Sequence, residues 1–501
     1  MKKTSAVWGL LVGMTMACHS VDRDTDIETD SDTDTDTDTD TDTDTDTDTD
    51  TDTDTDTPLS ETRILILGPA STQPEQIQDR LEQLFVADAL ATEVSVQAYT
   101  FPAPATPNLS EMSLMTFFYQ LDNRESRLAN IMVDVDHVVM MDTPRQPSER
   151  PEFHFEGVRT VGGLVEERGG TPHLLMPNVP STNADGWDKH IEHTYRVGIG
   201  TDTSIIPAGK MHYDDDASIA EIYTYSALSI YSSIRNISAS GLDITLDDMN
   251  EDAFSALANR VHNGLSEEAA ATHYEGDYSG VVHMNTSALP EVYRYMISGT
   301  SSERGYSNAM RTFLQDQGLP SETVDIGTCN ATKSVDTECL QRAAAEFNSR
   351  PFMSLYARGF DVSASDIKDS GGGDLQGQVY DRHWDSTTND GLDAVNDLEF
   401  RMSWVMDKAK MTDIAYLPQH LNFAKLKVTD PTAVLMNDGV HATPAIQYGL
   451  ATMSYVSRTG QTVIHTGAEP LKDQMAVFGE ETIRQWATLS ETGITIPEHT
   501  K

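Results

Sequence analysis

Short apolar runs separated by helical patterns constrain the fold of this chain more than any other feature. The apolar runs fall at residues 64–67, 94–98, 138–141, 174–176 and 204–206. Amphipathic helical patterns lie between them, at residues 76–88, 114–121, 155–168 and 187–197. Short runs rich in β-branched residues predict buried parallel strands, and each helix would form the crossover to the next strand. We therefore expect an α/β fold with a three-layer, doubly wound parallel sheet, whose ligand site lies at the carboxyl ends of the strands.

The middle of the chain, residues 210–433, has two interpretations. A large, mainly helical insertion is predicted by helical patterns at 217–236, 250–264, 306–317, 337–348 and 392–410. The alternative is a second α/β unit, because the passage from Gly280 to His283, with a helical run to Ser298, is similar to the passage from Gly439 to His441 and its helix. We expect the insertion, framed by core segments at 58–209 and 434–501.

An Asp-Gly-Val-His block, Asp438 to His441, stands directly before a helical pattern that starts at Pro444. An Asp and a His three positions apart lie within about one helical turn of each other. The carboxylate can then hold one imidazole nitrogen and leave the other to act as a general base. The alternative is structural: Asp438-Gly439 forms a turn, Asp438 or Thr443 caps the helix, and His441 is a polar boundary residue.

The order of several blocks resembles the SGNH/GDSL-type hydrolase family. The blocks are Arg63 to Gly68, Asp136 to Val139, Gly170 to Met176, Ile206 to Gly209 and Asp438 to His441. The resemblance implies a flavodoxin-like sheet and a Ser-His-Asp triad in which His441 is the general base and Asp438 orients it. In that family the nucleophilic Ser stands two positions after the Gly that ends the first strand. Here Ala70 stands at that place, so we expect the next residue, Ser71, to be the nucleophile.

Two polar residues near predicted strand ends, Gln146 and Asn178, are candidate donors to an oxyanion. The alternative for each is an ordinary polar residue of a loop. Acyl transfer through a Ser-His-Asp triad uses side chains alone, so we expect no metal ion and no organic cofactor. Cys329 and Cys339 lack a further Cys or His pair at ligand spacing, so we expect them to form a disulfide in an oxidising compartment.

The first 57 residues indicate export and anchoring. Residues 1–18 hold Lys2, Lys3 and an apolar run too short to remain in a membrane, which is typical of a signal peptide. The segment Thr15-Met16-Ala17-Cys18 resembles a bacterial lipobox, so Cys18 would carry the lipid that binds the chain to a membrane. The alternative is ordinary signal cleavage. Because no Asp follows Cys18, we expect the outer membrane or the cell surface.

Charge is spread unevenly along the chain. The formal net charge is −46, of which residues 19–57 contribute −17, from seventeen Asp and one Glu against one Arg. This segment is largely a Thr-Asp repeat with almost nothing to bury, so it predicts a disordered stalk. Lys2 and Lys3 add +2, which leaves −31 on residues 58–501. We expect no nucleic-acid partner, because phosphate binding needs clustered Lys and Arg.

Two functions follow from these patterns. The first is a cell-surface, SGNH-like esterase that hydrolyses an acyl or acetyl ester on a carbohydrate or lipid, with Ser71, His441 and Asp438 as its triad. The second is an inactive surface lipoprotein of the same fold that binds a glycan or a protein partner. The Ala at position 70 favours the second function, whereas the presence of both Asp438 and His441 favours the first.

Overall fold

The structure is a computed structural model of the 501-residue chain. Residues 56–501 form one compact unit. The structure describes residues 62–89, 93–105, 109–131, 134–176, 184–211, 219–244, 246, 249–266, 271–274, 278, 280–282, 284, 292–299, 303–330, 352–356, 377–380, 395–412, 415–438, 441–490 and 494–497. The predicted signal peptide, the lipidation site Cys18 and the stalk therefore lie outside the described residues. None of the described helices combines the length and apolar character that crossing a membrane requires.

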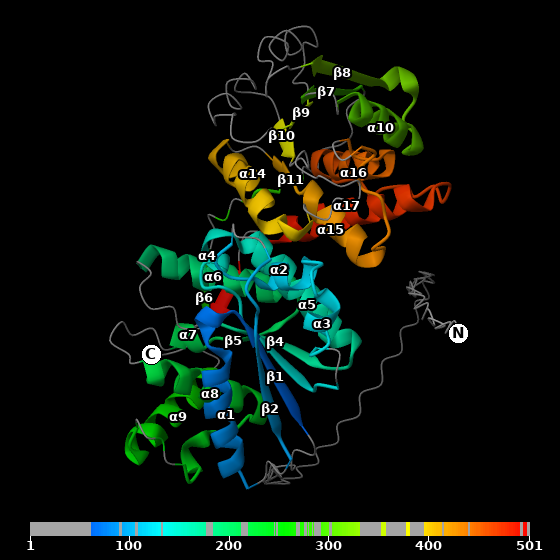
Figure 1. The fold of residues 1–501 in the computed structure, drawn as a ribbon. Helices are drawn as coiled ribbons and strands as arrows, with labels where there is room; N and C mark the ends of the chain where they lie inside the picture. The colour runs from blue at the N-terminus through cyan, green and yellow to red at the C-terminus, as the bar shows by residue number, and fades with distance from the viewer. Residues whose placement is uncertain are drawn as a thin grey trace, which may run out of the picture. The chain divides into compact units, whose positions relative to one another are not determined.

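The first sheet has five parallel strands in the order β2-β1-β3-β4-β5 (Figure 1). The strands are β1 (Arg63–Gly68), β2 (Ser95–Thr100), β3 (His137–Met140), β4 (Thr171–Leu175) and β5 (Ser204–Ile206). Helices and turns follow them: η1 (Ala70–Thr72), α1 (Pro74–Ala87), α2 (Leu114–Tyr119), α3 (Arg124–Leu128), α4 (Gln146–Glu149), α5 (Pro151–Glu167), α6 (Ala184–Gly200), α7 (Ala208–Met211), α8 (Ile219–Arg235), η2 (Ala239–Gly241) and α9 (Glu251–Ser266). The predicted doubly wound α/β fold is confirmed.

Both faces of this sheet are buried, which explains why its strands read as continuous apolar runs. Side chains alternate along β1, so Ile64 and Ile66 pack into one core cluster and Leu65 and Leu67 into another. Helices α1, α8 and α9 cover the first of these faces (Figure 1). Helices α2 and α5 cover the second, and the same core cluster continues into the C-terminal helices.

A second sheet of five parallel strands lies in the middle of the chain, with the order β8-β7-β9-β10-β11. The strands are β7 (Tyr293–Gly299), β8 (Val324–Asn330), β9 (Phe352–Tyr356), β10 (Gly377–Tyr380) and β11 (Ala415–Leu417). The other elements are α10 (Glu303–Asp316), η3 (Ser321–Thr323), α14 (Leu398–Thr412), α15 (Gln419–Thr429), α16 (Pro444–Thr459) and α17 (Pro470–Thr488). Two further strands, β6 (Ala271–Tyr274) and β12 (Ile494–Pro497), pair antiparallel.

The two sheets have the same topology. If strands are numbered along the chain within each sheet, both have the order 2-1-3-4-5. In each half, the helix after the first strand packs on the second helix after the last strand. These pairs are α1 with α8, and α10 with α16. We call residues 62–266 the first half and residues 292–490 the second half. Residues 210–433 thus hold helices together with a whole second sheet.

One local prediction in this region was wrong. The sequence predicted a helical run to Ser298, but Tyr293–Gly299 form strand β7. Tyr293, Tyr295 and Ile297 are buried at every second position, which is the period of a strand. The predicted helix at 337–348 and His283 lie outside the described residues.

A buried carboxylate, Glu156 on α5, joins the two halves. From the first half, the Tyr119 hydroxyl and an Arg159 nitrogen each donate to it at 2.6 Å. From the second half, Trp486 Nε1 donates at 3.3 Å, and Lys425 Nζ lies 3.9 Å away. Burial opposes ionisation of Glu156, but Arg159 and Lys425, together with these hydrogen bonds, lower its pKa to about 2.

We predict that Glu156→Gln lowers the free energy of unfolding at pH 7 by about 3–5 kcal/mol, because it leaves the buried Lys425 and the half-buried Arg159 without their carboxylate. Chemical denaturation of the full chain measures this difference. Glu166→Gln is the control, since Glu166 lies exposed near the end of the same helix. Equal stability of the two variants would contradict the assigned role.

The same substitution should change the acid stability of the protein. The folded pKa of Glu156 is depressed from 4.5, so its stabilising contribution is complete above that value and is lost as pH falls toward about 2. The wild type should therefore lose stability across this window by more than Glu156→Gln does. Denaturation midpoints measured at several pH values between 2 and 7 test the expectation. Parallel curves would contradict it.

Candidate functional site

The Asp438–His441 block lies in a tight loop between α15 and α16 of the second half. An isolated antiparallel bridge joins Met436 to Ala442, and Asn437 N donates to the His441 carbonyl at 2.8 Å. The loop is therefore closed at its base. Helix α16 starts at Pro444, where the missing N–H costs nothing.

Asp438 holds His441 through two contacts. Its Oδ1 accepts from the His441 backbone N–H at 2.8 Å, and its Oδ2 lies 2.7 Å from His441 Nδ1. The side chains are 55% and 36% exposed, so a substrate can reach them. A carboxylate at Nδ1 selects the tautomer that carries its proton there, which makes Nε2 the basic nitrogen. This is the geometry that a general base requires.

The structure tests part of the alternative in which this block is only a turn and a helix cap. Thr443 occupies the N-cap position of α16, but its side chain makes no capping hydrogen bond. The Asp438 carboxylate faces the imidazole and the backbone N–H of His441. A turn is thus present, and the same carboxylate also orients the imidazole.

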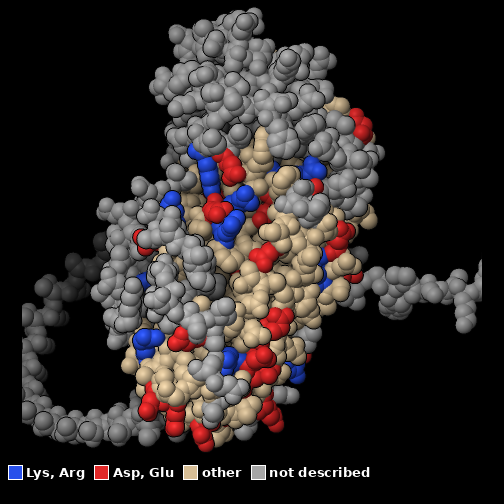
Figure 2. Space-filling model, turned by 60° about the vertical axis from the view of Figure 1, so that its left-hand side comes forward, with Lys and Arg blue, Asp and Glu red and all other residues tan. Residues whose placement is uncertain are grey.

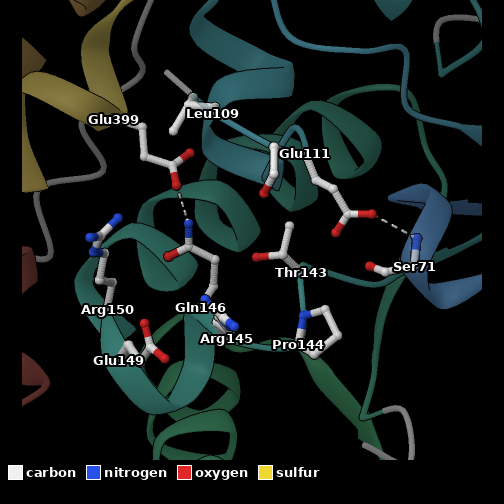
Figure 3. Close-up of a pocket in the computed structure, with 11 residues that line it drawn as sticks. Ser71, Leu109, Glu111, Thr143, Pro144, Arg145, Gln146, Glu149, Arg150 and Glu399 are labelled. Carbon is white, nitrogen blue, oxygen red and sulfur yellow. Dashed lines mark hydrogen bonds between the residues drawn. The ribbon is translucent and has the colours of Figure 1, made fainter. Parts of the chain in front are cut away.

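Ser71, the predicted nucleophile, lies in the first half. It belongs to η1, directly after β1, and its backbone N–H donates to Glu111 Oε1 at 3.0 Å (Figure 3). It lines a pocket of about 520 Å³ at the carboxyl ends of the first sheet's strands. Neither Asp438 nor His441 lines this pocket. Ser71 follows a strand of one sheet, whereas His441 follows the last strand of the other.

The pocket beside Ser71, which we call the first-half pocket, is lined mainly by residues with polar or charged side chains, and their carbon atoms supply part of its surface. Its lining is Ser71, Leu109, Ser110, Glu111, Thr143, Pro144, Arg145, Gln146, Glu149, Arg150 and Glu399. All but the last belong to the first half. Glu399 reaches in from α14 of the second half and is shown opposite Gln146 (Figure 3). The pocket is thus completed by both halves.

Glu399 is a buried acid at the base of this pocket. Its Oε2 accepts from the hydroxyls of Ser113 and Thr116, at 2.6 and 2.7 Å, and its Oε1 accepts from Gln146 Nε2. Burial raises its pKa and the charge of Asp142 adds to the rise, while the two hydroxyl donors act against it. No local sequence pattern predicts this role, because Glu399 is 286 residues from Ser113.

Of the two oxyanion candidates, the structure describes Gln146. Gln146 is buried in the pocket wall and its amide nitrogen is engaged by Glu399. Asn178 lies outside the described residues, as does Cys339, so the oxyanion roles and the disulfide with Cys329 stay predictions. Within the described ranges, no group of three or more His, Cys, Asp or Glu side chains is arranged to hold a metal ion.

Comparison with known proteins gives partial likenesses. No family model matches the sequence, and no curated protein matches it. A candidate SGNH hydrolase from Slackia heliotrinireducens is similar in structure with a TM-score of 0.27 and 16% identity, over 35% of this chain and 100% of that one. A DUF4886 family protein from Bacteroides uniformis has a TM-score of 0.32 and 10% identity, over 41% of this chain and 94% of its own.

We predict that nitrogen NMR of the His441 ring shows the proton on Nδ1 at neutral pH. Asp438→Ala removes the carboxylate that selects this tautomer, so the proton should redistribute toward Nε2. His465 provides an internal control, because its contact is with Glu480 instead. A wild-type ring protonated at Nε2 would contradict the assigned hydrogen bond.

Proposed function

We propose that this chain is an ester hydrolase of the SGNH type, and that its catalytic groups belong to the second half. The observation that carries the proposal is the double contact of Asp438 with His441 on an exposed loop. His441 acts as the general base and Asp438 holds its tautomer and stabilises the imidazolium. The substrate is an acyl or acetyl ester on a carbohydrate or lipid.

A comparison of the two halves supports this placement. His441 stands three residues before the first residue of α16. The residue three before the first residue of α8, the matching helix of the first half, is Asp216, which lies outside the described residues. At this position of the sequence, then, the first half has no imidazole, whereas the second half has His441 three residues after Asp438.

The nucleophile should come from the strand that begins the same sheet, because ligands of doubly wound sheets bind where the first strand and its neighbours end. In the second half that strand is β7, which ends at Gly299, and α10 begins at Glu303. The link is Thr300-Ser301-Ser302, outside the described residues. Ser301 stands two positions after Gly299, the family's spacing, so we propose Ser301 as the nucleophile in place of Ser71.

The reaction then follows the usual course of acyl transfer. His441 Nε2 removes the hydroxyl proton of the serine, which attacks the ester carbonyl, and the alcohol leaves with the proton that the imidazolium returns. Water, deprotonated by His441, next attacks the acyl-enzyme. The bond between the acyl carbon and the serine oxygen breaks, the imidazolium returns its proton to the serine, and the acid is released. Lipidation at Cys18 and the Thr-Asp stalk would hold this activity at the cell surface.

We predict that the full chain hydrolyses p-nitrophenyl acetate, and that Ser301→Ala and His441→Ala each lower kcat/KM by about 10³-fold or more. Asp438→Asn should lower it by about 10²–10⁴-fold through the wrong tautomer. Ser71→Ala and Ser302→Ala should retain activity. His465→Ala is a matched control, because His465 is 39% exposed in the same half.

The activities of these variants distinguish Ser301 from Ser71 as the nucleophile, and the esterase from the binding protein. Loss of activity in Ser71→Ala with retention in Ser301→Ala would restore the triad that the sequence first suggested. A wild type that hydrolyses no short-chain ester, or an activity indifferent to His441, would leave the glycan-binding lipoprotein as the function.

A further inference from the structure

The first-half pocket occupies the position at which doubly wound sheets bind their ligands. It opens at the carboxyl ends of β1 and β3, with Ser71 and Thr143 following these strands. Its lining contains no imidazole. A pocket in this position without a general base is suited to holding a ligand rather than to acyl transfer.

Hydrogen-bond acceptors and hydrogen-bond donors both line this pocket. Carboxylates of Glu111 and Glu149 can accept from ligand hydroxyls, and the hydroxyls of Ser110 and Thr143 can accept or donate. The apolar side chains of the lining are Leu109 and Pro144. Such a lining offers many hydrogen-bonding groups beside carbon surface, which matches a sugar ring with its hydroxyl groups and its apolar face.

Two guanidinium groups flank α4 at the same pocket. Arg145 is exposed, and its side chain forms no hydrogen bond or ion pair with any residue that the structure describes. Arg150 lies 4.0 Å from Asp407, a distance at which the pair is weak. On the face drawn in Figure 2, several Lys and Arg lie beside carboxylates in the upper part, and others are scattered among the Asp and Glu of the lower part. In a chain of net charge −46, the Arg145 guanidinium, with no ion pair among the described residues, and the weakly paired Arg150 together indicate a carboxylate on the ligand.

The walls of the pocket are held in place before any ligand binds. Asp142 Oδ1 accepts from the Thr143 and Leu114 N–H groups, at 2.8 and 3.1 Å. From α6, His193 Nδ1 lies 2.6 Å from the Pro147 carbonyl and fixes α4. Fixed walls reduce the entropy lost on binding.

One acceptor in the wall has no partner. Gln146 is 4% exposed, and its Oε1 makes no hydrogen bond within the described structure, although its Nε2 donates to Glu399. A buried acceptor without a donor is costly, so such groups commonly meet a ligand or water. A ligand hydroxyl in the pocket would supply the donor after a small movement of the amide.

We propose that the first-half pocket is a separate binding site for a sugar acid, a polyhydroxylated ring that carries a carboxylate. Arg145 and Arg150 bind the carboxylate, and Glu111, Glu149 and Gln146 accept from hydroxyls. A simple phosphate is disfavoured because Glu111 and Glu149 would repel it. The volume of about 520 Å³ exceeds the need of a single amino acid and admits a disaccharide.

This site is independent of the proposed esterase, because none of its lining residues belongs to the Asp438–His441 loop. If both proposals hold, the first half would bind an acidic glycan while the second half acts on esters. Binding and hydrolysis are measured separately, so either can fail alone.

Isothermal titration of the full chain with digalacturonic acid tests the proposal, with neutral galactobiose as the matched sugar. We expect 1:1 binding of the acid, and about 10-fold or greater weakening in Arg145→Ala, as for loss of a charge-assisted hydrogen bond. Arg145→Lys should lie between, because an ammonium cannot bind a carboxylate in the bidentate mode. Binding of the acid should also weaken as salt is raised.

Arg168→Ala is the control, since Arg168 is exposed beyond the other end of the sheet and should leave binding unchanged. Failure of digalacturonic acid to bind, or binding equal in Arg145→Ala and wild type, would overturn the site. Stronger binding of inorganic phosphate or of the dipeptide Glu-Lys would also overturn it, by assigning the pocket to another class of ligand. Because Arg145 is exposed, its substitution should leave folding intact, and the thermal midpoint checks this.

Discussion

The arrangement of this protein depends on a single buried charge. Glu156 lies on α5, between the first sheet and the C-terminal helices, and receives hydrogen bonds from Tyr119, Arg159 and Trp486. An ionised carboxylate without such partners would cost several kcal/mol in this interior. Its partners come from both halves, so the charge is fully compensated only when the halves are packed together. Two other buried glutamates repeat the pattern: Glu152 lies 3.5 Å from Lys410 Nζ, and Glu399 accepts from Ser113 and Thr116.

The sequence predicted the first sheet well and the second poorly, for a physical reason. Strands buried on both faces are continuous apolar runs, as in Ile64 to Leu67, and these stand out from their surroundings. In β7 and β8, apolar residues alternate with polar ones over short stretches, as in Tyr293-Arg294-Tyr295. Such stretches resemble loops or helices when their neighbours are unknown. The Asp438–His441 pair was predictable because its partners are close in sequence, whereas the role of Glu399 depends on contacts that span hundreds of residues.

The two halves share one topology but carry different side chains on their loops. Both have the strand order 2-1-3-4-5, and both place loops at the carboxyl ends of the strands. The second half carries an exposed carboxylate–imidazole pair on its loop, and the first half carries a polar pocket with two arginines. The fold therefore does not decide the function; the side chains on its loops do.

The pairing of β12 with β6 has a consequence for the order in which the chain can fold. Strand β12, residues 494–497, is made long after residues 271–274, with which it pairs. Trp486, the indole donor to Glu156, also follows the other partners of that carboxylate in the chain. A nascent chain that has not yet reached residue 486 thus has a first half with a partly compensated buried charge and an unpaired strand β6. These contacts can form only after residues 486–497 have left the ribosome.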